Sequence, residues 1–425
     1  MLPVTGANKL RINCYRVTLR VKGPGGHDSD AKERSVISEQ VHLFVLDDNG
    51  IVFSERSQKV FALNTTATLI WCWLEQGVTT SEIVGRLAEG AGLSDAESAD
   101  HIERLMTQWR ADGLMDGGKE ITPVDARVAP DEPIPELPDL PAQLYQFTDE
   151  RRYKLLDTTF VVRFASTALA ELAHSCFRHL TDAGATPPDA IFGVAETQGG
   201  YLVLQNGEAA RWCDEVRLVV PVLKHLIAAY AIDRSRYLLN VHAGVVGTAQ
   251  GCLLLPGVAG SGKSTLTAAL VKKGYTYFSD EHGLLEHESL WARAVPLALC
   301  VKSTGSEVVG ELFPELMSLP MHKRFDNKIV RYMPPPGHDE DASALRRPVQ
   351  AVIFPQYDPC AETNLTPMSK VEALYRLMEH CSVIPEWFDR GKVARLVEWI
   401  SDLDCHSLRY SSLKVAVELI GQRWR

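Results

Sequence analysis

The segment GCLLLPGVAGSGKST, residues 251–265, has the residue types and spacing that bind a chain of phosphates. It contains Gly257, four further residues, and then Gly262, Lys263 and Ser264, which is the complete phosphate-loop (P-loop) pattern. Backbone N–H groups in such a loop point at phosphate oxygens, the lysine neutralises the outer phosphates, and the serine hydroxyl can ligate Mg²⁺. The expected nucleotide-binding residues are Gly257, Val258, Ala259, Gly260, Ser261, Gly262, Lys263, Ser264 and Thr265.

Two adjacent carboxylates, Asp280 and Glu281, follow the apolar segment GYTYFS one helix and one turn after Lys263. An acid at a strand end beside a phosphate loop can hold Mg²⁺ or accept a proton from an attacking hydroxyl, and two acids can divide those tasks. The structural alternative is a solvated strand end. Given the loop upstream, we favour the chemical role.

Two further candidates are less specific. His242 lies in the apolar strand expected over residues 237–246, where a lone histidine is more often a core residue than a catalyst. Residues 320–337 form the most basic stretch, with four cations that can clamp phosphates or an acidic peptide. A solvated loop explains them equally well, and Arg331 is the best single candidate among them.

These side chains need elements to position them. The apolar run 252–255 predicts a buried strand, and the apolar spacing after Lys263 predicts a helix that begins at the loop. Near the N-terminus, residues 41–53 predict a hairpin with an Asn-Gly turn at Asn49 and Gly50, followed by three helices. A small sheet beside three helices is typical of a winged-helix unit.

Composition shifts divide the chain into five parts. Six prolines with interspersed acids over residues 117–148 predict an extended linker. The expected parts are an N-terminal extension (1–35), the winged-helix unit (36–116), this linker (117–148), an α+β lead-in (149–236) and an α/β phosphate-loop domain (237–425).

Charge and cysteine content narrow the functional classes. The net charge of −10 argues against a broad nucleic-acid footprint. The third helix of the front unit carries only two basic residues, Arg104 and Arg110, which is too few for a winged-helix DNA reader. Nine scattered cysteines, no apolar run of about eighteen residues and no signal layout predict a cytoplasmic protein that binds neither nucleic acid nor membrane.

The front unit resembles the PqqD family of peptide chaperones. The matching segments are VFALNTTATLIW from Val60, the pattern Gly77-x-Thr79-x-x-Glu82-Ile83, and the closing Trp109 with Gly113-Leu-Met. The resemblance implies that residues 36–116 capture the leader of a precursor peptide, which adds as a strand to the sheet edge and packs against the last helix. An inert scaffold domain is the alternative.

Residues 237–425 are similar to the HPr kinase fold family, and more closely to its HPr-kinase-related branch. The matching pieces are His242-Ala-Gly, the phosphate loop, Ser279-Asp-Glu, Val295-Pro-Leu with Lys302-x-x-Gly, and the tail Leu408-Arg-Tyr-x-x-Leu. The resemblance implies a P-loop domain related to phosphoenolpyruvate carboxykinase, with ATP at the loop, Asp280 as the base and His242 as its active-site neighbour. The second HPr kinase signature is not found, so HPr is not the expected substrate.

The favoured hypothesis is an ATP-dependent kinase that phosphorylates a Ser or Thr hydroxyl of a peptide or protein, and the expected acceptor is a precursor peptide recruited by residues 36–116. Lys263 neutralises the phosphates, Ser264 and Glu281 hold Mg²⁺, and Asp280 deprotonates the hydroxyl. Two alternatives stay open: a small-molecule kinase on the same scaffold, and a non-catalytic nucleotide-binding adaptor. Homo-oligomer formation through the C-terminal helices is a further expectation.

Overall fold

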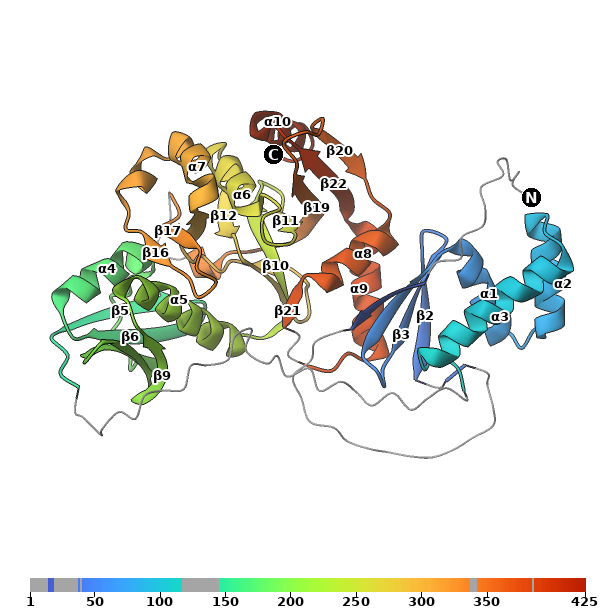
Figure 1. Cartoon of the computed structure of the whole chain (residues 1–425), viewed down its shortest axis with the longest axis horizontal. Helices are drawn as coiled ribbons and strands as arrows, with labels where there is room; N and C mark the ends of the chain where they lie inside the picture. The colour runs from blue at the N-terminus through green and yellow to red at the C-terminus, as the bar shows by residue number, and fades with distance from the viewer. Residues whose placement is uncertain (1–13, 19–36, 39, 117–144, 337–341, 384–385) are drawn as a thin grey trace. The chain divides into compact units, whose positions relative to one another are not determined.

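The computed structural model describes residues 14–18, 37–38, 40–116, 145–336, 342–383 and 386–425 (Figure 1). It is a mixed α/β structure with several sheets, and the chain divides into two compact units. The first unit comprises residues 1–127, 368–379 and 386–402, and the second comprises residues 128–367, 380–385 and 403–425. Most of the proline-rich segment and nearly all of the N-terminal extension lie outside the described residues.

The first unit is a four-stranded antiparallel sheet with the order β1-β4-β3-β2. Its elements are β1 (Cys14–Thr18), β2 (Val41–Leu46), β3 (Asn49–Ser54), β4 (Lys59–Leu63), α1 (Thr65–Glu75), α2 (Thr80–Ala91), α3 (Asp95–Ala111), α8 (Lys370–Glu379) and α9 (Arg390–Asp402). The three expected helices are present, and Asn64, Thr79 and Ser94 cap them with side-chain oxygens.

The hairpin turn of this sheet differs from the expected one. The two-residue turn is Asp47-Asp48, both with positive φ, and Asn49 and Gly50 already belong to β3. Gly50 serves close packing instead, because a Cβ there would lie 2.7 Å from the Thr68 hydroxyl on α1. The glycine therefore marks where α1 approaches the sheet, and the Asn-Gly turn was a wrong prediction.

Helices cover both faces of this sheet. Helices α1 to α3 pack on one face and α8 and α9 on the other (Figure 1). All five residues of β4 are buried, as expected for a strand covered on both sides. The Gln58 side chain fixes the C-terminal segment, because its amide donates to the Phe388 carbonyl at 2.9 Å and its oxygen accepts from the Phe388 N–H at 2.8 Å. The division proposed from the sequence placed α8 and α9 with the phosphate-loop domain, whereas their apolar faces pack on the front sheet.

The second unit contains three sheets. The first has the order β5-β6-β7-β8-β9 and carries α4 and α5. Its elements are β5 (Asp149–Leu155), β6 (Thr158–Phe164), α4 (Thr167–Phe177), β7 (Ala190–Thr197), β8 (Gly200–Gln205), β9 (Glu208–Cys213) and α5 (Val216–Asp233). Its core continues into Leu284, Val295 and Leu297, so this lead-in and the region that follows it share one core.

The largest sheet has ten strands, and its main path is β18-β14-β13-β10-β11-β19-β22-β20. The elements are β10 (Tyr237–Gly247), β11 (Cys252–Pro256), α6 (Lys263–Lys272), β12 (Thr276–Ser279), β13 (His282–Glu286), β14 (Ala292–Arg293), β18 (Arg346–Arg347), β19 (Val349–Tyr357), β20 (Asn364–Pro367), β21 (Cys381–Val383), β22 (Asp404–Tyr410) and α10 (Leu413–Arg423). Strands β12 and β21 also pair with β10. Helices α6 and α10 pack on this sheet through Leu266, Leu270 and Ile420.

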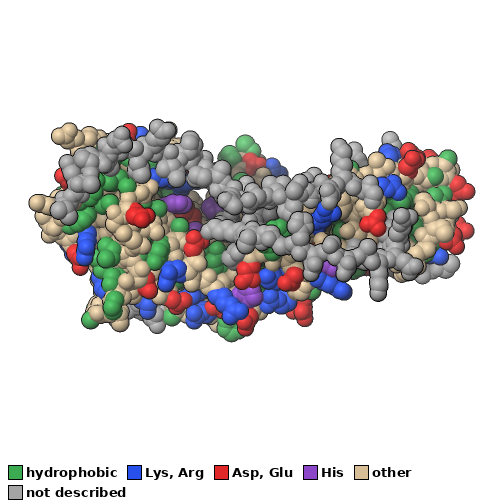
Figure 2. Space-filling view, turned by 90° about the horizontal axis from the view of Figure 1, so that it is seen from below, with side chains coloured by type: hydrophobic (Ala, Val, Ile, Leu, Met, Phe, Trp, Pro, Cys, Tyr) green, Lys and Arg blue, Asp and Glu red, His purple; other side chains and the backbone are tan. Residues whose placement is uncertain are grey.

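A small sheet of β15 (Leu299–Lys302), β16 (His322–Lys323) and β17 (Ile329–Met333), with α7 (Ser306–Leu312), lies against α6. Acidic and basic side chains are interspersed over the described surface seen in Figure 2. Among the described residues, no helix has both the length and the apolar character needed to cross a bilayer.

Candidate functional site

The glycine-rich loop lies where strand β11 passes into helix α6, which is the position that its sequence pattern requires. Strand β11 is buried along its whole length, and α6 begins at Lys263. Neighbouring strands fix the loop from both sides. The Gly257 N–H donates to the His242 carbonyl of β10 at 3.4 Å, and the Tyr357 N–H at the end of β19 donates to the Ser261 carbonyl at 3.0 Å. The loop is therefore held at the carboxyl end of β11, between β10 and β19.

Glycine is required at position 262 for two reasons. Its φ is +89°, and a Cβ there would collide with the hydroxyl of Tyr410, which donates to the Gly262 carbonyl at 3.1 Å. We expect Gly262→Ala to lower the free energy of unfolding by more than the about 1–2 kcal/mol that left-handed backbone costs an alanine. Nucleotide binding should also weaken. Chemical denaturation and calorimetric titration with ATP measure both effects.

Gly274→Ala is the matched control for that substitution. Gly274 has a φ of +99°, but nothing lies within 4 Å of a Cβ placed there, and the residue is outside the loop. Its replacement should lower the free energy of unfolding only by the cost of left-handed backbone for alanine, and it should leave ATP binding unchanged. Equal stability and equal ATP affinity in the two variants would show that the Tyr410 contact does not shape the loop.

Lys263 is almost fully buried, and its ammonium donates to the carbonyls of Gly257 and Val258 within the loop, the latter at 2.9 Å. Burial, with the nearby charge of Lys302, lowers the pKa of Lys263 to about 8. In contrast, the buried hydroxyl of Ser261 has no hydrogen-bond partner among the described residues. A cation folded onto its own loop and an unsatisfied hydroxyl are the features that an incoming anion satisfies.

Asp280 and Glu281 connect β12 to β13 and line the same cavity as Lys263. The Ser279 hydroxyl accepts the N–H groups of Glu281 and His282 and so turns the chain at this point. The Asp280 carboxylate is 2% exposed and accepts the Cys300 N–H at 2.8 Å. Burial, followed by the charge of Glu281, raises the pKa of Asp280 to about 6. This carboxyl group can therefore take up a proton near neutral pH.

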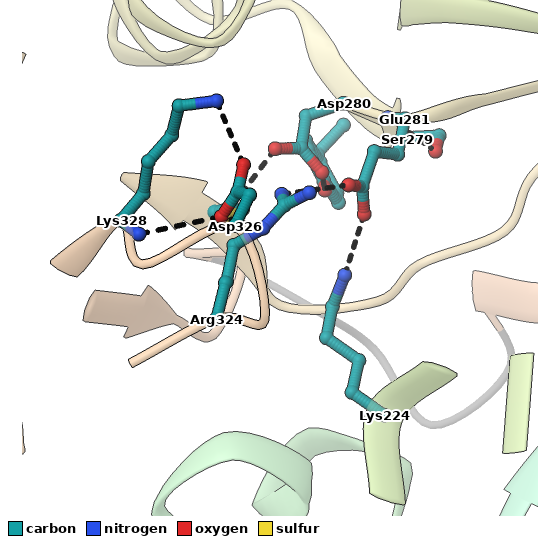
Figure 3. A network of polar contacts seen from close by, with 9 residues as sticks. Lys224, Ser279, Asp280, Glu281, Arg324, Asp326 and Lys328 are labelled. Atoms are coloured by element: carbon teal, nitrogen blue, oxygen red, sulfur yellow. Dashed lines mark hydrogen bonds and ion pairs between the residues drawn. The ribbon is translucent and has the colours of Figure 1, made fainter. Parts of the chain in front are cut away.

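Glu281 lies in a different electrostatic environment. Its carboxylate accepts from the Lys224 ammonium at 2.7 Å and lies 3.7 Å from the Arg324 guanidinium (Figure 3). The charge of Lys224 holds the pKa of Glu281 well below its usual range. Burial acts to lower the pKa of Lys224, but the charge of Glu281 more than offsets it, so the ammonium stays protonated. Two cations thus keep Glu281 ionised beside the more basic Asp280.

The cavity that these residues enclose measures about 410 Å³. It brings together most of the predicted site residues, including His242, whose pKa is lowered by burial and by Lys263, so the ring is neutral. The cations at its rim are Lys302, Arg324 and Lys328. Lys328 pairs with Asp326 at 2.7 Å, whereas Lys302 has no ion-pair partner among the described residues.

Of the four predicted catalytic residues, Arg331 is the one that the structure does not bring to this cavity. The predicted loop residues Gly257, Val258 and Ser261 do not line it either. Arg331 lies on β17 with its guanidinium directed to the Met317 carbonyl at 3.5 Å, and it is not among the lining residues. Arg324 and Lys328, from the same basic stretch, take the position expected for it. Sequence spacing does not distinguish them, because the chain turns back between β16 and β17. Within the described part of the basic stretch, only residues of that turn line the cavity with Asp280 and Glu281.

The residues that sequence reasoning missed come from distant segments. Lys224 is 57 positions before Glu281 on α5, and nothing in the apolar spacing of that helix separates this buried lysine from a surface lysine. Tyr357 and Tyr410 are the last residues of β19 and β22 and also line the cavity. Only the order of the strands in the sheet, which the sequence does not state, brings these side chains to the loop.

The first unit contains a segment that matches a known family. Residues 49–115 match the family model described as Coenzyme PQQ synthesis protein D (PqqD). The match begins at β3 and ends just after α3, so it lies inside the predicted range 36–116 and supports a PqqD-like domain there. Strands β1 and β2 and helices α8 and α9 of the same unit lie outside it. No curated protein matches the chain.

Proposed function

We propose that the protein is an ATP-dependent kinase that phosphorylates a Ser or Thr hydroxyl of a peptide, and that its PqqD-like domain recruits that peptide. The observation that carries the proposal is one cavity lined by a phosphate loop, its lysine and a buried carboxylate whose pKa is raised toward neutrality. The HPr kinase-like motifs of residues 237–425 support the same chemistry. The PqqD-like match supports a peptide acceptor and a role in peptide modification.

The residues divide the work as follows. Loop N–H groups and the Lys263 ammonium bind the triphosphate, and Lys302 adds positive charge at the same end of the cavity. Asp280 accepts the proton of the attacking hydroxyl as the hydroxyl oxygen forms its bond to the terminal phosphorus. The bond from that phosphorus to the leaving ADP oxygen breaks in line. Arg324, paired with Glu281, and Lys328 can bind the negative charge of the transferred group.

The residues present fit Mg²⁺ in a limited way. Within the described ranges, no cluster of three or more His, Cys, Asp or Glu side chains can hold a metal alone. A magnesium ion at a phosphate loop takes most of its ligands from phosphates and water, so the Ser264 hydroxyl is a sufficient protein ligand. Glu281 is paired with Lys224, so we propose that its charge attracts the magnesium ion without direct ligation. When bound, the ion would neutralise negative charge on the outer phosphates.

The pH dependence of transfer follows from two pKa values. Asp280 acts in its ionised form, so the rate should fall about tenfold per pH unit below about 6, where the carboxylate takes up a proton. Phosphate binding raises the pKa of Lys263 from about 8, so affinity for ATP should hold below pH 8 and decline above it. The pH profiles of kcat/KM and of ATP affinity measure the two limbs. A flat acid limb would contradict the role of Asp280.

Peptide recruitment has a structural condition in this chain. The family mode is addition of a peptide strand to the sheet edge, yet β4 already pairs with β1 from Cys14↔Leu63 to Thr18↔Lys59. Helix α8, on one face of the sheet, contacts both strands. A recruited peptide that uses this edge must replace β1.

We expect the double substitution Arg16→Pro with Val17→Pro to free that edge, because a proline has no N–H to donate to the neighbouring strand. Alternate residues of β1 donate to β4, so one of two adjacent prolines removes such a hydrogen bond. A fluorescein-labelled peptide of residues 10–22 should then bind in trans, at least about tenfold more tightly than to the unmodified chain. Fluorescence anisotropy measures this. Leu2→Pro with Val4→Pro, outside β1, is the control. Unchanged binding in the β1 variant would place recruitment elsewhere.

The kinase proposal is tested by incubating the protein with Mg²⁺, γ-labelled ATP and a candidate precursor peptide encoded near its gene, followed by mass spectrometry. The expected product is a phosphopeptide, formed by the unmodified chain and absent with Lys263→Ala. A phosphorylated small molecule in place of the peptide would favour the small-molecule kinase. ATP binding without any labelled acceptor would favour the nucleotide-binding adaptor.

A further inference from the structure

The cavity has an aromatic wall that phosphate chemistry does not use. Tyr357 and Tyr410 line it together with Leu413, on the side of the loop formed by β19, β22 and the start of α10. Phosphates bind to N–H groups and cations, so these rings need another ligand group. Tyr410 has a structural role, because it is 2% exposed and its hydroxyl donates to the Gly262 carbonyl. Tyr357 is 50% exposed, and its hydroxyl makes no such hydrogen bond to the loop among the described residues.

The strand order gives the direction in which a bound nucleotide runs. The loop follows β11, with β10 on one side of that strand and β19 then β22 on the other (Figure 1). Asp280 follows β12, which pairs with β10, so the acids lie on the β10 side. Tyr357 ends β19, on the opposite side. A triphosphate whose terminal phosphate faces Asp280 therefore extends its nucleoside toward Tyr357.

The Tyr357 ring is held in place for such a contact. Its backbone N–H donates to the Ser261 carbonyl of the loop at 3.0 Å. Its ring meets the Tyr410 ring edge to face, with centroids 5.6 Å apart and an interplanar angle of 64°. The ring is thus supported by a buried tyrosine, while half of the Tyr357 surface stays exposed and the residue lines the cavity. A supported, exposed aromatic ring is what a nucleobase stacks on.

We propose that Tyr357 is the stacking platform for the purine base of the nucleoside triphosphate. This inference rests on the proposed nucleotide site and adds its base subsite. Stacking reads the face of a base and not its hydrogen-bonding edge, so the platform accepts adenine and guanine alike. The platform therefore discriminates weakly between ATP and GTP, and the contacts to the phosphates supply most of the binding energy.

The test compares ligands with and without a base. Tyr357→Ala, Tyr357→Phe and the unmodified chain are titrated calorimetrically with ATP, GTP and inorganic tripolyphosphate in Mg²⁺. Tyr357→Ala is expected to weaken ATP and GTP binding about tenfold and to leave tripolyphosphate binding unchanged. Tyr357→Phe keeps the ring and should bind all three as before. Trp291→Ala removes an exposed aromatic residue that does not line the cavity and should change nothing.

The other outcomes overturn the proposal in distinguishable ways. Equal loss of ATP and tripolyphosphate binding would mean that Tyr357 only supports the loop. Unchanged ATP binding in Tyr357→Ala, while the unmodified chain binds both ligands, would remove the base platform and leave the phosphate site intact. If the unmodified chain binds neither ligand, the nucleotide site fails, and with it the proposed function.

Discussion

Replacing Asp280 by asparagine is expected to lower the rate of phosphoryl transfer by about 10²–10⁴ while ATP affinity stays close to that of the unmodified chain. The amide keeps the shape of the carboxylate and can still accept the Cys300 N–H, but it cannot take up the hydroxyl proton. Single-turnover kinetics with a phosphorylatable peptide, together with calorimetric titration of ATP, separate the two effects.

Asp326→Asn is the matched control for Asp280→Asn, since Asp326 lines the same cavity but is exposed and pairs with Lys328. Its replacement should change the rate severalfold at most, because an exposed ion pair contributes little. A transfer rate in Asp280→Asn equal to that of the unmodified chain would contradict the assignment of the base. A loss of ATP binding in the same variant would contradict the division of roles between loop and acid.

Lys263→Ala is expected to abolish measurable transfer and to weaken ATP binding by roughly 10- to 100-fold, the loss of charge-assisted hydrogen bonds to the outer phosphates. The same substitution should leave the nucleotide-free protein at least as stable as before. The lysine ammonium is buried against loop carbonyls, and its lowered pKa shows that burial disfavours the charge. Titration with ATP and thermal unfolding without nucleotide give the two readouts.

Lys272→Ala tests whether any lysine of helix α6 would give the same result. Lys272 lies in the last turn of that helix, over the Phe313 ring at 5.0 Å, and does not line the cavity. Its removal should not change ATP affinity. Unaltered ATP binding in Lys263→Ala would exclude the loop as the phosphate site, and a marked loss of stability in that variant would show that its inactivity comes from misfolding.

The sequence was sufficient for the local parts of this site. The glycine spacing, Lys263 and the strand before them define the loop, and the acids follow after one helix and one strand, so short-range order places them together. The helix caps of the front unit were equally local, since Asn64, Thr79 and Ser94 act on N–H groups of their own helices.

The parts that the sequence could not provide depend on long-range pairing. Lys224 neutralises Glu281 from a separate helix, and this pair sets the two acids apart in basicity. Tyr357 reaches the loop because β19 pairs with β11 in parallel. Helices α8 and α9 return to the front sheet through contacts such as Gln58 with Phe388, more than 300 positions apart. No local pattern encodes these contacts.

The most direct test of the central claim, that the loop and Asp280 act on the same phosphate, is a crystal structure with Mg²⁺ and a non-hydrolysable ATP analogue. We predict the triphosphate in the loop, the Lys263 ammonium moved from the loop carbonyls to the outer phosphates, and the Asp280 carboxylate facing the terminal phosphorus with room for one hydroxyl between them. Phosphates bound outside the loop, or a terminal phosphate directed away from Asp280, would contradict the account.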